Sequence, residues 1–227
     1  MAHSNRGRDS VAHDGSTSGD GRAGAKETEE EEARPPRVWI HADESCLGNQ
    51  FRDRARAGGA AGLVEHWRGG QWVRRDYWIA EPDTTNNRMA IQSALEPLRA
   101  LRASCWIHFV SDSEYLVKGM TEWLPGWKAR GWRRRRGAIE NLELWQALDE
   151  AATRHRIHWH WVRGHAGHPE NEYAHHLAVQ AATVQEDSGG LIPSSFDEWL
   201  DNERDRHERY LDYQEFLPPG ERWPDLG

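Results

Sequence analysis

The stretch Arg37-Val38-Trp39-Ile40-His41-Ala42-Asp43 is a largely apolar run that ends in an aspartate. A second apolar run, Cys105-Trp106-Ile107-His108-Phe109-Val110, leads into Ser111-Asp112 in the same way. Short apolar runs of this length predict strands, the second of them buried in a sheet. Two carboxylates that meet at strand ends repel each other unless a proton or a cation lies between them. A hard divalent cation such as Mg²⁺ prefers such oxygen ligands. Asp43 and Asp112 are therefore candidate metal ligands.

The rest of the chain predicts three strands joined by hairpins, followed by strands that are separated by helices. We expect the strands at residues 37–43, 58–67, 72–80, 105–110 and 157–162. We expect the helices at residues 88–101, 114–123, 141–153 and 171–184, with the second helix broken at Pro125-Gly126. This order implies an α/β fold, a five-stranded mixed sheet of three antiparallel strands and then parallel ones, flanked by helices.

Composition divides the 227 residues into three parts. Residues 1–36 are rich in Gly, Ser, Asp, Arg and Glu and cannot bury enough apolar surface to offset the entropy of ordering. We expect a disordered acidic tail there, with an acidic interaction tail as the alternative. Residues 37–184 form the expected α/β domain. Residues 185–227 carry scattered aromatic and apolar side chains that suggest a helical extension packed on the domain.

Charge and cysteine content limit the function classes. The net charge of −8 and the pI of about 5.9 do not indicate a nucleic-acid binder as a whole, but basic residues gather at 128–136. Two cysteines outside any C-x-x-C pair argue against a disulfide framework or a cysteine-based zinc site. No apolar run is long enough to cross a membrane and no signal core is visible. We expect a cytoplasmic monomer without a membrane partner.

Two further groups have competing interpretations. Arg133-Arg134-Arg135-Arg136 follows Trp127 and Trp132, and four adjacent arginines repel each other without an anion. We favour phosphate binding over a solvated charge run. His158 and His160 lie two apart on a strand and face the same side. A zinc site can use this spacing, but no third ligand is evident, so two solvent-side histidines are the favoured interpretation.

Five stretches, in this order, resemble the type 1 ribonuclease H family. They are Asp43-Glu44-Ser45-Cys46-Leu47-Gly48-Asn49, Thr84-Thr85-Asn86-Asn87-Arg88-Met89, Ser111-Asp112-Ser113-Glu114-Tyr115, the set Trp123, Trp127, Lys128, Gly131 and Trp132, and Gly164-His165-Ala166-Gly167-His168-Pro169-Glu170-Asn171-Glu172. The match covers roughly residues 37–182. Each motif alone is weak, but five in order argue strongly against accident.

The resemblance implies a ribonuclease H-like fold and an enzyme that cuts the RNA strand of an RNA/DNA hybrid. In the family four carboxylates hold two Mg²⁺ ions, one activating water and the other stabilising the leaving oxygen. Asp43 and Asp112 occupy two of these four positions. The other two positions hold Ala90, where the family has a glutamate, and His175, where it has an aspartate.

Three residues bear on this departure from the family. His175 remains a possible metal ligand or proton carrier, because imidazole can do both. Glu44 stands where the family usually has glycine, and its carboxylate can reach the same site if the chain bends there. A solvated loop residue is the alternative for Glu44. His165 matches the proton-shuttling histidine of the family and would assist product departure.

The resemblance also implies a nucleic-acid surface. Small hydrogen-bonding residues would read the minor groove and a DNA phosphate, where the 2′-hydroxyl distinguishes RNA from DNA. A basic handle would grip the hybrid. The first group is Asn49, Thr85, Asn86 and Asn87; the second is Trp123, Trp127, Lys128, Trp132, Arg133 and Arg134.

These observations leave three functions open. The first is an Mg²⁺- or Mn²⁺-dependent endonuclease on RNA/DNA hybrids, with an altered metal site. The second is a catalytically impaired module that binds hybrid or duplex nucleic acid. The third is a different metal-dependent nuclease on the same fold. Asp43, Asp112 and His165 favour the first, because buried acids are costly without a cation. Ala90 favours the second.

Overall fold

The structure is a computed structural model, and it describes residues 35–48, 56–164 and 167–214. The predicted tail at residues 1–36 therefore lies almost wholly outside the described residues. In chain order the elements are β1 (Arg37–Cys46), β2 (Gly58–Arg68), β3 (Gln71–Glu81), α2 (Asn86–Ala100), β4 (Trp106–Ser111), α3 (Glu114–Lys118), the π-helix η1 (Gly119–Trp123), α4 (Leu124–Ala129), α5 (Leu142–Ala152), β5 (Arg156–Trp161), α6 (Pro169–Val184), β6 (Ile192–Pro193) and α7 (Phe196–His207).

The strands form one mixed sheet in the order β5-β4-β1-β2-β3-β6. β1, β2 and β3 pair antiparallel, whereas β4 pairs parallel with both β1 and β5. This confirms the predicted α/β fold class. The sheet has one strand more than expected, because the two residues of β6 pair with Arg75 and Asp76 of β3. A two-residue strand is too short to leave an alternating pattern in the sequence.

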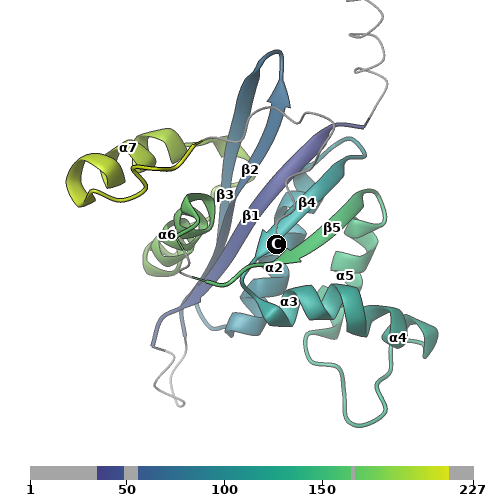
Figure 1. Ribbon diagram of the computed structural model, residues 1–227. Coiled ribbons are helices and arrows are strands. Elements are labelled where there is room, and N and C mark those ends of the chain that lie inside the picture. The colour runs from purple at the N-terminus through teal and green to yellow at the C-terminus, as the bar shows by residue number, and fades with distance from the viewer. Residues whose placement is uncertain (1–34, 49–55, 165–166, 215–227) are drawn as a thin grey trace, which may run out of the picture. The chain divides into compact units, whose positions relative to one another are not determined.

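Helices cover both faces of the sheet (Figure 1). On one face, Ile40 and Ala42 of β1 pack with Ala90 of α2 and Trp145 of α5. On the other face, β2 packs against α6 and α7. Because side chains alternate along a strand, Trp39, His41 and Asp43 point to the α6 face and Glu44 follows Ala42 toward the α2 face. No helix in the described part of the chain is both long and apolar enough to cross a membrane.

The predicted break of the second helix at Pro125-Gly126 is wrong. α3, η1 and α4 follow one another without a gap from Glu114 to Ala129. The N–H of Leu124 donates to the carbonyl of Gly119, which is the wider bonding of a π-helix. Pro125 then falls in the first turn of α4, where a missing N–H costs little. Gly119 is required here because a Cβ would lie 2.1 Å from the Trp145 ring.

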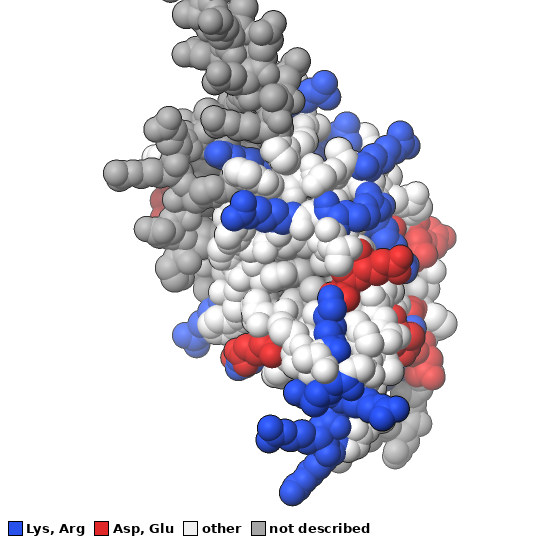
Figure 2. All heavy atoms as spheres, turned by 90° about the vertical axis from the view of Figure 1, so that its right-hand side faces the viewer, with Lys and Arg blue, Asp and Glu red and all other residues white. Residues whose placement is uncertain are grey.

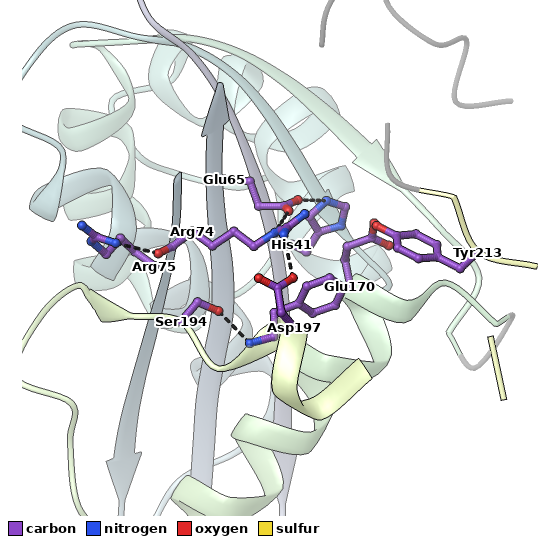
Figure 3. Close-up of polar contacts among 9 residues, drawn as sticks. His41, Glu65, Arg74, Arg75, Glu170, Ser194, Asp197 and Tyr213 are labelled. Atoms are coloured by element: carbon purple, nitrogen blue, oxygen red, sulfur yellow. Dashed lines mark hydrogen bonds and ion pairs between the residues drawn. The ribbon is translucent and has the colours of Figure 1, made fainter. Parts of the chain in front are cut away.

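The C-terminal segment is attached to the sheet by polar contacts (Figure 3). Arg74 of β3 donates to Glu65 Oε1 at 2.8 Å and to Asp197 Oδ1 of α7 at 2.7 Å. The hydroxyl of Tyr213 donates to Glu170 Oε1 at 2.5 Å, at the start of α6. α7 lies within the expected helical extension, whose boundary at residue 184 stays a prediction.

Candidate active site

Three carboxylates meet where the parallel pairing of β1 with β4 ends. The pairing of β1 with β4 ends at Ala42 and Ser111, so Asp43 and Asp112 follow equivalent positions. One ligand oxygen each of Asp43, Glu44 and Asp112 lies within 4.8 Å of the other two. Within the described ranges, this is the one group of three or more possible metal ligands that is so compact. The group contains the two predicted ligands, Asp43 and Asp112, and also Glu44, the predicted substitute for the missing glutamate.

The orientation of the Asp43 side chain explains how two neighbouring residues of β1 share one site. Strand alternation alone would direct Asp43 and Glu44 to opposite faces. Here the Asp43 carboxylate accepts the N–H of the next residue, Glu44, at 2.6 Å. Glu44 is half-buried, and its Oε2 has no hydrogen-bond partner. Burial, followed by the charges of Asp43 and Asp112, holds the pKa of Glu44 well above its usual value, although a hydrogen bond with Ser113 opposes this.

This arrangement fits a divalent cation. A half-buried carboxylate with an unpartnered oxygen beside two other carboxylates is unfavourable unless a proton or a cation compensates. Oxygen-only ligands suit Mg²⁺ and Mn²⁺. Ala90 is fully buried on α2 and packs in the core with Ala42. Glu44 therefore extends toward the face from which a glutamate at position 90 would also project.

His175 reaches the site from α6 without joining the carboxylate group. Its Nδ1 lies 3.2 Å from Asp43 Oδ2. This hydrogen bond raises the pKa of His175; burial opposes it, and the charges of Asp43, Glu172 and Asp112 add to it. The contact favours an imidazolium that holds Asp43 in place. Whether His175 also contacts a metal stays a prediction.

Trp161, the last residue of β5, and Gly164 after it both lie against Asp112. A Cβ added to Gly164 would lie 2.2 Å from Asp112 Oδ2, so only glycine leaves room for this carboxylate. Trp161 Nε1 donates to the Asp112 carbonyl at 3.0 Å. Sequence reasoning included Gly164 in a motif but missed both contacts, because they join residues about 50 positions apart. His165 and Asn49 lie outside the described residues.

The predicted groove-reading residues lie at the start of α2. The Thr85 side chain caps the helix by accepting the N–H of Arg88 at 3.3 Å. Asn86 and Asn87 are exposed in the first turn. A helix N-terminus carries partial positive charge and suits a phosphate. Contact of these residues with nucleic acid stays a prediction.

The predicted basic handle consists of a packed part and an exposed part. Trp127 is 9% exposed and contacts Trp123 and Trp145, so its ring belongs to the core. Trp132 is half-buried, with φ of 61°, and Lys128 pairs with Asp149 at 2.8 Å. Residues 133–136 are all exposed. Figure 2 shows basic side chains gathered at the end of the molecule where α4 and the loop after it lie.

Comparison with known proteins identifies relatives of the whole α/β domain. The sequence model of the family described as RNase H matches residues 35–183. A ribonuclease H of Pseudomonas paraeruginosa is 47% identical over 142 residues, which are 62% of this chain and 90% of the relative. A ribonuclease H of Chelativorans sp. is 44% identical over 161 residues, 70% of this chain and 94% of the relative.

Solved structures agree with this relationship. The crystal structure of LC9-RNase H1, described as a type 1 RNase H with the type 2 active-site motif, is 52% identical. It superimposes with a TM-score of 0.69 over 73% of this chain and 81% of that one. The RNase H domain of PFV, solved in solution, shares the fold at 16% identity, with a TM-score of 0.57 over 67% of this chain and 98% of that one.

Proposed function

Because the chain belongs to the ribonuclease H family, a family of hydrolases, we propose that it cleaves the RNA strand of RNA/DNA hybrids at a site built on Asp43, Glu44 and Asp112. The observation that carries this proposal is the approach of the three carboxylates to within 4.8 Å of one another. One of the three is Glu44 on β1, which would replace the glutamate that the family has at the position of Ala90 on α2.

The site would hold Mg²⁺ or Mn²⁺ through these three side chains. A divalent cation bound there supplies Lewis-acid activation of water and stabilisation of the leaving oxygen. Asp43 is held by the N–H of Glu44 and by His175, and Asp112 is kept in its place by the absence of a side chain at Gly164. The residues around the carboxylates thus orient them before any cation binds.

The relative LC9-RNase H1 supports an altered site of this kind. It is described as a type 1 RNase H with the type 2 active-site motif, and it is 52% identical to this chain. A type 1 fold therefore occurs with an active-site motif other than the type 1 motif. We assign the same combination to this chain, because Ala90 departs from the type 1 pattern and Glu44 joins the two retained aspartates.

The substrate would lie across the asparagines at the start of α2 and the exposed arginines after α4. Arg133 and Arg134 carry exposed charge, so we assign phosphate contact to them. Trp123 and Trp127 pack inside and would support this segment from beneath. Asn86 and Asn87 would meet the minor groove, where the 2′-hydroxyl is displayed.

The second candidate function is a binding module without catalysis. Ala90 and His175 favour it, because both remove negative charge from positions where the family holds metal. Incubation of the purified protein with a labelled RNA/DNA hybrid, in Mg²⁺ and separately in Mn²⁺, separates the two. We expect cleavage of the RNA strand in at least one of the two, and loss of cleavage in Asp112→Asn. Tight hybrid binding with no cleavage in either metal would establish the binding module.

A further inference from the structure

A second cluster of metal-ligating side chains lies on the sheet, outside the carboxylate site. His108 of β4 is the register partner of His158 on β5, and His160 follows two residues later on the same face. The ring centroid of His108 lies 5.0 Å from that of His160 and 5.4 Å from that of His158. The centroids of His158 and His160 are 6.5 Å apart. His108, on the neighbouring strand, is thus the third histidine that the sequence analysis did not find.

Two nitrogens of His108 and His160 already lie nearly as far apart as two ligands of one metal ion. His108 Nδ1 lies 2.8 Å from His160 Nε2. Two imidazole nitrogens on one tetrahedral Zn²⁺, each about 2.0–2.1 Å from the ion, lie roughly 3.3 Å apart. A cation would enter between these two nitrogens after a shift of about half an ångström and a change of tautomer. The tautomer change moves the shared hydrogen to the other nitrogen of the donating ring.

The lowered pKa values of two of the three histidines also favour metal binding. Burial, then the neighbouring His160, His158 and Arg37, lowers the pKa of His108 to about 3. Burial, then His158, lowers the pKa of His160. Neutral imidazole is the form that ligates a metal, so these two rings need not lose a proton first. His158 is exposed and leaves the cluster open to solvent.

We propose that His108, His158 and His160 form a site for a borderline transition-metal cation, of which Zn²⁺ and Ni²⁺ are representative. Nitrogen ligands select such ions over Mg²⁺, so the site is chemically distinct from the carboxylate site. Three ligands from adjacent strands leave a fourth position for water or an anion. The cation would tie the edge strand β5 to β4, the strand that leads into Asp112.

Binding requires a change in side-chain orientation. The three rings are parallel to within 17°, and nitrogen lone pairs lie in the ring planes. Stacked rings do not direct their lone pairs at one point, so His158 must turn out of the stack. It is free to do so because it is the exposed member of the three. The strands need not move, since all three residues lie within paired β-structure.

Calorimetric titration of the full chain with Zn²⁺ and with Ni²⁺ tests this proposal. The protein carries no histidine affinity tag, and millimolar Mg²⁺ is present to compete at the carboxylates. We expect one ion to bind with a dissociation constant in the micromolar range or below. His158→Gln and His160→Gln should each weaken binding about tenfold or more, whereas His207→Gln, at an exposed histidine of α7, should not. The stability of each variant is checked by thermal unfolding.

Two outcomes would overturn the proposal. One is the absence of Zn²⁺ and Ni²⁺ binding in the native protein. The other is binding that survives both histidine substitutions but is lost in Asp112→Asn, which would assign the ion to the carboxylate site. His158→Gln tests the site with the least effect on folding, because His158 is exposed.

Discussion

Replacing Glu44 by Gln should make the metal-free protein more stable and the metal-loaded protein less stable. In the absence of a cation, Glu44 is a half-buried carboxylate facing Asp43 and Asp112, and it is repelled by both. Glutamine keeps the shape and removes the charge. With a cation bound, the same change removes one of three anionic ligands. The variant should therefore be the more stable protein without metal, and the native protein the more stable one with metal.

The magnitude follows from the distances. Two full charges no more than 4.8 Å apart repel by at least about 3 kcal/mol at an effective dielectric constant of about 20. The raised pKa of Glu44 means that a proton already relieves part of this repulsion. We therefore expect a net gain on the order of 1 kcal/mol, or about 2–4 °C in melting temperature for a domain of this size.

Thermal unfolding in EDTA and across a millimolar series of Mg²⁺ and of Mn²⁺ measures both effects. Native protein should gain melting temperature with metal by mass action, and Glu44→Gln should need roughly 10–100 times more metal for the same gain. Glu150→Gln, at an exposed glutamate of α5, is the matched control and should follow the native curve. A variant that is less stable in EDTA and responds to metal as native does would refute the assignment of Glu44 to the site.

Three other substitutions address the surroundings of the site. Gly164→Ala should weaken metal-induced stabilisation and hybrid cleavage, because its Cβ would lie 2.2 Å from Asp112 Oδ2; the control Gly126→Ala meets only the flexible end of an arginine and should change neither. Alanine at all four of residues 133–136 should weaken hybrid binding and reduce its salt dependence by about 0.9 in log–log slope per lost phosphate contact, measured by fluorescence anisotropy; an unchanged slope would show that they do not meet phosphate. Arg74→Met should lower the free energy of unfolding in urea by about 3 kcal/mol, because it leaves the buried carboxylate of Glu65 without its arginine and with His41 Nε2 at 3.6 Å; a loss below about 1 kcal/mol would contradict this.

Local patterns predicted the strands and two of the carboxylates well. Apolar runs with an aspartate at the end identified β1 and β4, and parallel pairing then brings Asp43 and Asp112 together. The role of Glu44 could only be a hypothesis, because it depends on how the Asp43 side chain turns at the strand end. That orientation comes from one backbone hydrogen bond and leaves no periodic signal.

Features that depend on distant partners were missed or misread. The third histidine, His108, joins His158 and His160 through strand pairing, which the spacing on β5 does not report. Trp127 suggested stacking on a ligand, yet Trp145 from another helix buries it. The prediction of a helix break at Pro125 was wrong, because the chain passes through a π-helix before Pro125 and the missing N–H leaves no helical bond unmade. In the first two cases a partner distant in sequence decides the outcome, and in the third the helix itself changes its hydrogen-bond pattern.

Transfer of the glutamate between β1 and α2 tests the central claim most directly. The measurement is the cleavage rate of a labelled RNA/DNA hybrid in Mg²⁺ and Mn²⁺ by native protein, Glu44→Gln, and the double variant Glu44→Gln, Ala90→Glu. We predict cleavage by native protein, a loss of at least tenfold in Glu44→Gln, and partial recovery in the double variant. Native-like cleavage by Glu44→Gln would contradict the claim that Glu44 supplies the carboxylate that position 90 lacks.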